Sequence, residues 1–312
     1  MSSRDDDAAL TAASADAAVS AEPDPVEVVP LRHWGRWVAA AILVVLVAGI
    51  VFGLSRAQIN YGNVPGFFSE SVMLTGLVHT LELAIACQAL GIVLGTILAT
   101  MRVSANPVAS WTAWAYIWIF RGVPVLLQLL LWYNLALVVK TIAIPGLFSF
   151  PTNEVMSPFV AALLGLGLNE SAYMAEIVRA GFNSVDKGQI EAAYAIGMTP
   201  RKTLRRVILP QAMRVIIPPT GNDFINMLKE TSLASVIAYL ELVQAATNIY
   251  SRNLQVIEAL LAAAAWYMIL VTLASIGQHY IEQAFSPDRR TTGPGVLSRI
   301  QTSLRPSLNR SV

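Results

Sequence analysis

Long apolar runs alternate with short polar stretches along most of this 312-residue chain. A helix needs about 20 apolar residues to cross the ~30 Å of hydrocarbon in a bilayer. The runs therefore predict membrane-spanning helices joined by short loops. The six predicted spans are residues 37–54, 72–101, 123–139, 158–180, 208–228 and 254–284.

The composition favours a membrane protein over a soluble one. Hydrophobic residues make up 55% of the chain and charged residues 13%, whereas soluble domains carry roughly 25% charged residues. The net charge of +1 provides no basic field for nucleic acid. A single cysteine, Cys87, excludes an internal disulfide and a multi-cysteine metal site, and the three histidines are scattered. We therefore expect no metal and no cofactor.

The two ends of the chain differ from its middle. Residues 1–35 are rich in Ala, Ser, Asp and Glu, which predicts a disordered cytoplasmic tail. Residues 36–55 hold the uncharged first span, expected to be an extra transmembrane helix that packs against lipid. Residues 286–312 place several arginines among Ser, Thr, Pro and Gly, which predicts a basic, disordered cytoplasmic tail.

The distribution of Lys and Arg predicts the orientation in the membrane. With both termini in the cytoplasm, only Arg56, Lys140, Lys229 and Arg252 face outward, and the other 17 of the 21 basic residues face inward. The reverse topology would reverse this ratio. We therefore expect a multi-pass protein of the cell membrane with both termini cytoplasmic.

An aromatic stretch precedes the third predicted span. Residues 111–120 are rich in Trp and Tyr and lead into Arg121-Gly122-Val123-Pro124. Trp and Tyr favour the membrane interface, and Arg121 is expected to reach the cytoplasmic headgroups. We expect a helix along the inner interface that turns at 122–124 into the third span.

The cytoplasmic loop at 183–207 predicts more helix than a simple connector needs. Asp186 is placed to cap a first short helix, and Gly197 supplies a left-handed stop. Thr199 and Pro200 predict the start of a second short helix. From these residues alone, the loop could equally be a surface hairpin in which Glu191 is a solvated acid.

The spacing of residues in this loop resembles a known motif. The loop carries Glu191-Ala192-Ala193, then Gly197, and finally Val207-Ile208-Leu209-Pro210. This pattern is similar to the EAA motif of permease subunits of ATP-binding-cassette importers, with Val207 in place of Ile. In that family the loop forms the coupling helices that sit in a groove of the ATPase subunit. The resemblance implies this coupling role for Glu191, Ala192, Ala193, Gly197, Leu209 and Pro210.

Other stretches resemble the polar amino acid branch of the same family, which carries histidine, glutamine, glutamate, arginine or opines. These stretches are 76–81, 121–128, 171–179 and 229–233. The resemblance implies an all-α polytopic membrane protein with a five-helix type I importer core at 70–285, which includes the coupling loop. The extra N-terminal helix departs from the branch.

The resemblance also implies a function and a set of partners. The chain would be the permease subunit that translocates a polar amino acid delivered by an extracytoplasmic solute-binding protein. Its partners would be a separate ATP-binding subunit, that binding protein, membrane lipid and a second permease subunit, identical or homologous. The chain lacks the Gly-x4-Gly-Lys-Ser/Thr loop, so we do not expect it to be an enzyme itself.

Polar groups inside the predicted spans are candidates for the substrate path. An ionisable group deep in a span costs about 2.5–3.5 kcal/mol on insertion scales, so each needs a role. Glu170 lies near mid-span, where it could receive the α-ammonium of an amino acid or make a structural hydrogen bond. Glu176 and Arg179 are expected to form an ion pair. The candidate substrate-path residues are Gln128, Asn169, Glu170, Asn222, Asp223, Asn226, Thr231 and Ser232.

Each of these polar residues has the alternative role of a helix–helix contact. Pro218-Pro219-Thr220-Gly221 is expected to break the fifth span and expose backbone groups to a cavity. Two other functions stay open. One is an ion- or proton-coupled secondary amino acid transporter with Glu170 and Asp223 as a proton relay, and the other is a membrane interaction subunit without a transport path.

Overall fold

The computed structural model describes residues 34–57, 59–144 and 148–285. The chain divides into two compact units, with the boundary in the sequence between residues 58 and 59. The predicted tail at 286–312 and most of the tail at 1–35 lie outside the described residues. In the first unit, α2 (Trp34–Arg56) covers the first predicted span. Its apolar part, Trp37–Gly53, is shorter than the other candidate spans, so a transmembrane role for this helix stays a prediction.

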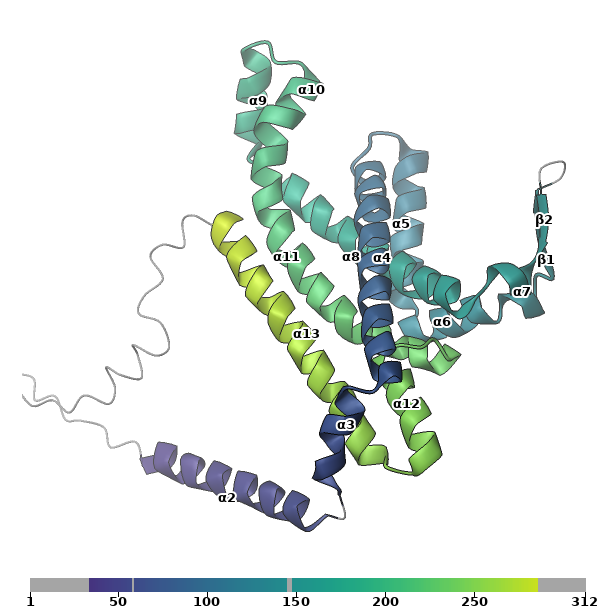
Figure 1. The fold of residues 1–312 in the computed structure, drawn as a ribbon. Coiled ribbons are helices and arrows are strands. Elements are labelled where there is room, and N and C mark those ends of the chain that lie inside the picture. The colour runs from purple at the N-terminus through teal and green to yellow at the C-terminus, as the bar shows by residue number, and fades with distance from the viewer. Residues whose placement is uncertain (1–33, 58, 145–147, 286–312) are drawn as a thin grey trace, which may run out of the picture. The chain divides into compact units, whose positions relative to one another are not determined.

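The second unit contains the remaining predicted spans (Figure 1). Its short N-terminal segments are η1 (Tyr61–Asn63) and α3 (Val64–Phe68). Its longer helices are α4 (Ser71–Arg102), α5 (Pro107–Gly122), α6 (Val125–Tyr133), α8 (Pro158–Asn183), α11 (Leu209–Glu230), α12 (Leu242–Asn253) and α13 (Val256–Phe285). Four predicted spans, 72–101, 158–180, 208–228 and 254–284, fall within α4, α8, α11 and α13 to within a few residues.

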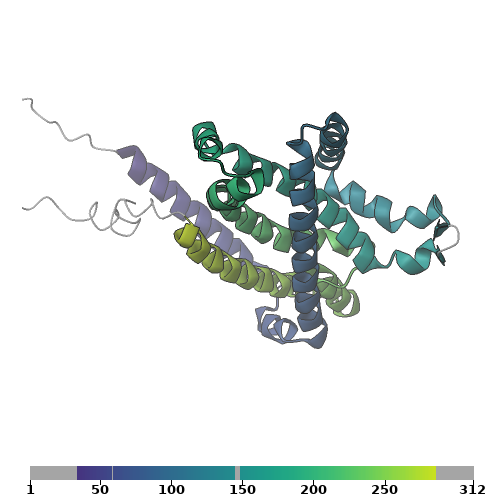
Figure 2. The ribbon, with the colours of Figure 1, turned by 90° about the horizontal axis from the view of Figure 1, so that it is seen from above.

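Small residues let α4 and α8 pack closely through the middle of the second unit (Figure 2). A Cβ atom at Gly95 of α4 would lie 2.7 Å from the Cβ of Met174 on α8. At Gly91 it would lie 2.5 Å from the Cγ of Glu170. Small residues at helix interfaces allow such approach in membranes, where apolar surface alone gives helices little reason to associate.

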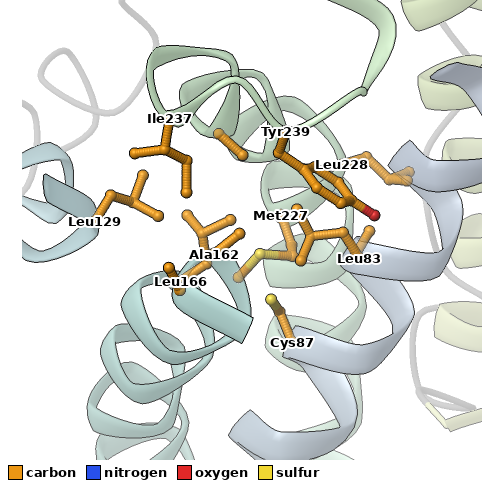
Figure 3. Packing of buried hydrophobic residues seen from close by; sticks show 12 residues of the cluster. Leu83, Cys87, Leu129, Ala162, Leu166, Met227, Leu228, Ile237 and Tyr239 are labelled. Carbon is orange, nitrogen blue, oxygen red and sulfur yellow. The ribbon is translucent and has the colours of Figure 1, made fainter. Parts of the chain in front are cut away.

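The largest apolar cluster lies between α4, α6, α8 and α11 (Figure 3). Leu83 and Cys87 of α4 meet Leu129 of α6, Leu166 of α8 and Met227 of α11. Cys87 is fully buried, where it serves as a small apolar side chain. A second cluster joins α12, α13 and the start of α4.

The predicted third span at 123–139 is wrong as a single helix. The helix α6 ends at Tyr133, where the side-chain nitrogen of Asn134 donates to the Leu130 carbonyl oxygen at 2.8 Å. After a short 3-10 turn, β1 (Thr141–Ile144) and β2 (Phe148–Pro151) form an antiparallel hairpin, followed by α7 (Thr152–Val155). Apolar residues after position 134 include several β-branched ones, and an apolar run alone does not distinguish helix from strand. The fold is therefore mainly helical, with one two-stranded sheet.

The chain bends by 99° between α5 and α6. The helix α5 ends at Gly122, as predicted, and packs through Ala113 and Ile117 against Leu98 of α4 and Ala175 of α8. Among the described residues, α4 and α13 are each long and apolar enough to span a membrane, and bent helix pairs raise the number to four. The location of 111–120 at the inner interface stays a prediction.

The predicted break at Pro218-Pro219 is wrong, because α11 continues through both prolines. The amide nitrogen of Gln278 on α13 donates to the Pro218 carbonyl oxygen at 2.8 Å. The Thr220 hydroxyl donates to the Ile216 carbonyl oxygen, also at 2.8 Å. The first bond joins α13 to α11 at the prolines, and the second is a side-chain bond within α11. A bend of 45° comes later, between the stretch 200–237 and α12.

Candidate functional site

A cavity of about 430 Å³ lies where the bend between α5 and α6 meets α8 and α11. We call it the acidic cavity. Its lining residues are Arg121, Gly122, Val123, Pro124, Val125, Asn169, Glu170, Tyr173, Asp223, Asn226 and Glu230. Half of the eight candidate substrate-path residues are among them, although they come from two helices more than 50 positions apart in the chain.

Glu170 is the most enclosed charged group of the acidic cavity. Its side chain is 6% exposed, and its Oε1 atom has no hydrogen-bond partner among the described residues. The absence of a side chain at Gly91 gives it room. Asp223 also has a buried oxygen, Oδ2, without a partner in the described part of the chain. A buried acceptor without a partner is costly, so these oxygens favour a ligand that donates hydrogen bonds.

The charges around the acidic cavity are unbalanced. Glu170, Asp223 and Glu230 contribute carboxylates, and Arg121 contributes the only guanidinium of the lining. The Arg121 guanidinium carbon lies 4.8 Å from the centre of the Tyr173 ring, a cation–π contact. The cavity therefore offers more negative than positive charge to a ligand, with the positive group held at one side.

Two amide side chains fix the bend that forms one wall. Asn169 donates to the Phe120 carbonyl oxygen at 2.6 Å. Gln128 donates to the carbonyl oxygens of Phe120 and Val123, both at 2.9 Å. These carbonyls end a helix and have few partners within it. Gln128 is buried outside the lining, so its placement favours a structural role.

Three other candidate residues lie outside the lining. Asn222 is exposed, although it shares a helix with the lining residue Asn226. Thr231 is fully buried, and its hydroxyl donates to the Leu228 carbonyl oxygen at 2.9 Å. The Ser232 hydroxyl donates to the Lys229 carbonyl oxygen at 2.6 Å.

Sequence reasoning missed three lining residues that carry charged or hydroxyl side chains. Tyr173 lies one helical turn after Glu170, and Glu230 lies one turn after Asn226, so helical spacing could have found both. Arg121 was expected at the headgroups, but it lies over Tyr173 in the cavity wall. This position follows from the packing of α5 against α8, which the sequence did not define.

The coupling loop forms the first short helix as predicted. The helix α9 spans Lys187–Ala195, and the Asp186 carboxylate accepts a hydrogen bond from the Gly188 backbone N–H at 2.8 Å. Gly197 has φ of +78°, the left-handed conformation expected after a helix. The second short helix is not separate, because α10 (Pro200–Thr203) continues through a π-helical segment, η3 (Leu204–Ile208), into α11.

The EAA residues divide between a packed and an open face of α9. Ala193 is buried, while Glu191 and Ala192 are exposed. Beyond the helix Gly197 is exposed, and so are Leu209 and Pro210 at the start of α11. The exposed face thus presents a carboxylate and a small side chain to any partner.

A direct contact joins the coupling loop to the helix that lines the cavity. The Gln211 side-chain nitrogen on α11 donates to Gln189 Oε1 on α9 at 2.6 Å. The same helix carries Asp223, Asn226 and Glu230, and its 22 residues make about 33 Å of continuous α-helix. Figure 1 shows α9 and α10 at the end of α11 that lies away from α12.

The predicted ion pair forms near the end of α8. The Arg179 side-chain nitrogen Nε donates to Glu176 Oε2 at 3.0 Å. Both groups lie outside the acidic cavity. They instead line a second cavity, together with Arg102 and two tryptophans.

With fold and cavity defined, comparison with known proteins identifies the class. Residues 91–287 match the family of binding-protein-dependent transport system inner membrane components. This match covers more than half of the chain, and the chain belongs to that family. The predicted membership in the permeases of amino acid ATP-binding-cassette importers is confirmed.

Individual relatives agree with this class. The chain is 45% identical over 271 residues to the arginine transport system permease protein ArgU of Corynebacterium glutamicum, covering 86% of this chain and 85% of the relative. It is 42% identical to the probable amino-acid permease protein YxeN of Bacillus subtilis, covering 70% of this chain and 93% of the relative. A crystal structure of an amino acid ABC transporter with histidines matches with 34% identity and a TM-score of 0.64, covering 73% of this chain and all of that one.

The chain is thus the permease component of a binding-protein-dependent importer of the plasma membrane. The alternative of an ion- or proton-coupled secondary transporter fits these relatives less well. The family match makes the chain a component of a transport system, as expected from the sequence.

Proposed function

We propose that this permease imports a cationic amino acid and that the acidic cavity is its cargo site. The observation that carries the proposal is the charge of the lining, three carboxylates against one guanidinium. The cavity volume of about 430 Å³ lies in the range of small-molecule sites. The relative ArgU, named an arginine transport system permease protein, supports the same cargo class.

The arrangement of charges suggests how an amino acid lies in the cavity. Arg121 is the group that binds the α-carboxylate, because a guanidinium pairs with a carboxylate in bidentate geometry. Glu170 receives the α-ammonium, which supplies donors to its unpaired Oε1. Asp223 and Glu230, on α11, then face the cationic end of the side chain. This pose leaves each cargo charge paired, which a site of low dielectric constant requires.

The coupling loop is the proposed contact with the separate ATP-binding subunit. Glu191 and Ala192 lie on the exposed face of α9, where the carboxylate can pair with a basic group of that subunit. Movement of α9 passes to α11 through the contact between Gln189 and Gln211. Because α11 is continuous, the movement shifts Asp223 and its neighbours in the cavity wall. ATP can drive this transition because the two conformations of the permease make different contacts with the ATP-binding subunit.

The proposal extends to the assembly and its orientation. An extracytoplasmic binding protein delivers the cargo, and a second permease subunit, identical or homologous, completes the path. Both termini lie in the cytoplasm, with residues 36–55 as an added transmembrane helix before the core at 70–285. The excess of Lys and Arg in the inward-facing segments supports this orientation.

Uptake by the reconstituted importer tests the proposal. Glu170→Gln keeps the shape of the side chain and removes its charge, and we expect arginine uptake in proteoliposomes to fall about 10-fold or more. The matched control is Glu154→Gln, since Glu154 is exposed on α7 and outside the cavity lining. ATP hydrolysis without cargo should stay unchanged in both variants. Equal arginine uptake by Glu170→Gln and native protein would remove the acidic cavity as the cargo site.

A further inference from the structure

A second cavity, of about 540 Å³, lies between the end of α4, the second half of α5 and the last turns of α8. Its lining includes Arg102, Arg179 and Glu176 together with Trp114 and Trp118. We call it the arginine–tryptophan cavity. It shares Arg121 and Gly122 with the acidic cavity, and its other lining residues take no part in the proposed cargo pose.

The guanidinium groups give this cavity an excess of positive charge. Arg102, Arg121 and Arg179 face a single carboxylate, Glu176, which is already paired with Arg179. Arg102 donates through one Nη atom to the Ser110 hydroxyl at 2.9 Å. That bond uses one of its five donors, so the others stay available to an anion. The charge of the lining is thus suited to a negatively charged ligand.

The tryptophans give the same cavity an apolar side. The rings of Trp114 and Trp118 are stacked with their centroids 6.1 Å apart, and the side chains are 42% and 65% exposed. Trp111, 68% exposed, continues this row along α5. Exposed tryptophans beside arginines are typical of the level where lipid headgroups meet acyl chains.

Two of the three arginines, Arg102 and Arg179, lie at helix ends that fit the headgroup level. Arg102 is the last residue of α4, and Arg179 precedes the end of α8 by four residues, or about 6 Å along the helix. Trp118 and Arg121 lie about 16 Å and about 21 Å along α5 from its start at Pro107, so both are farther from this end of the helices than Arg102. The end of α8 leads into the basic loop 183–207, which the positive-inside rule assigns to the cytoplasm.

We propose that the arginine–tryptophan cavity binds the phosphate group of an anionic phospholipid from the cytoplasmic leaflet. Arg102 and Arg179 hold the phosphate through charge-assisted hydrogen bonds, and the tryptophans cover the adjoining glycerol and acyl segments. Basic pockets between membrane helices on the cytoplasmic side are suited to such headgroups. A free phosphate ion shares the charge chemistry, but it makes no use of the tryptophan row.

Lipid binding to the full chain in a neutral detergent tests the proposal. Native mass spectrometry would measure the affinity for dioleoylphosphatidylglycerol and dioleoylphosphatidylcholine, with and without excess inorganic phosphate. We expect at least ~10-fold tighter binding of phosphatidylglycerol, little competition by phosphate, and an approximately 10-fold loss in Arg102→Gln. The matched control is Arg252→Gln, an exposed arginine on α12 outside this cavity, which should bind like native protein.

A second variant distinguishes a specific loss of lipid binding from misfolding of Arg102→Gln. Arg102→Lys keeps the charge and loses the planar fork, so its affinity should lie between those of native protein and Arg102→Gln. Equal binding of the two lipids, or unchanged binding in both Arg102 variants, would overturn the proposal. Displacement of phosphatidylglycerol by stoichiometric inorganic phosphate would also overturn it, because the site would then bind a free anion.

Discussion

The acidic cavity and the arginine–tryptophan cavity are neighbours with opposite charge. Both include Arg121 and Gly122 in their linings. The first places three carboxylates beside one guanidinium, whereas the second places three guanidinium groups beside one paired carboxylate. The end of α5 thus separates a site suited to a cation from a site suited to an anion. Arg121 is the residue whose loss should affect both.

The sharpest test of this contrast reverses a charge in one cavity only. Glu170→Lys puts a cation where the cargo ammonium is proposed to bind. We expect arginine uptake in proteoliposomes to fall at least ~100-fold, since an attractive pair becomes a repulsive one in a buried site. Retention of phosphatidylglycerol by the same variant should stay within about twofold of native protein. Joint loss of both properties, with the fold intact by circular dichroism, would show that the cavities are not independent.

A smaller change should displace Glu170 without altering its charge. Gly91→Ala adds a methyl group whose carbon would lie 2.5 Å from the Glu170 Cγ, so the carboxylate must move. We expect uptake to fall about 10-fold, with destabilisation of about 1–3 kcal/mol measured by thermal unfolding. Gly277→Ala is the matched control on α13, because no atom lies within 4 Å of the added methyl position. Native-like uptake in Gly91→Ala would mean that the position of Glu170 has little importance for cargo.

Loss of Arg121 should weaken both cavities together. In Arg121→Gln we expect arginine uptake to fall about 10-fold and phosphatidylglycerol affinity about threefold, because other arginines remain in the second cavity. Agmatine, which is arginine without its carboxylate, should compete with arginine for binding more effectively in Arg121→Gln than in native protein. An unchanged ratio of agmatine to arginine binding would exclude Arg121 as the carboxylate-binding group.

The smallest effect should separate two asparagines on one helix. Asn226 lines the acidic cavity and Asn222 does not, although they are one turn apart. We expect Asn226→Ala to lower arginine uptake about threefold and Asn222→Ala to leave it unchanged, as the loss of one neutral hydrogen bond predicts. Equal effects in the two variants would place the cargo elsewhere on α11.

The parts that the sequence predicted well depend on local chemistry. Asp186 and Gly197 define the ends of α9 because a cap and a left-handed residue act on the backbone next to them. Glu170 was recognised because a carboxylate inside an apolar run is costly wherever the helix lies. The lengths of α4 and α13 were likewise predictable, because each helix follows one continuous apolar run of the sequence.

The parts that the sequence did not predict depend on distant contacts. The helix α11 is continuous through Pro218, and Gln278, 60 positions later, donates to the Pro218 carbonyl, a contact that no local pattern specifies. Arg121 lies over Tyr173 because α5 packs against α8, a distant contact that no local pattern specifies. The end of α6 was missed because apolar residues beyond it form a hairpin strand instead of helix.

Direct binding of arginine and citrulline to the full chain tests the central claim most simply. Citrulline has nearly the same shape as arginine but carries no charge on its side chain. The purified permease in nanodiscs, without binding protein, should bind arginine at least ~10-fold more tightly, and Asp223→Asn should reduce that preference to threefold or less. Equal affinity of native protein for the two amino acids would contradict a cargo site built around acidic side chains.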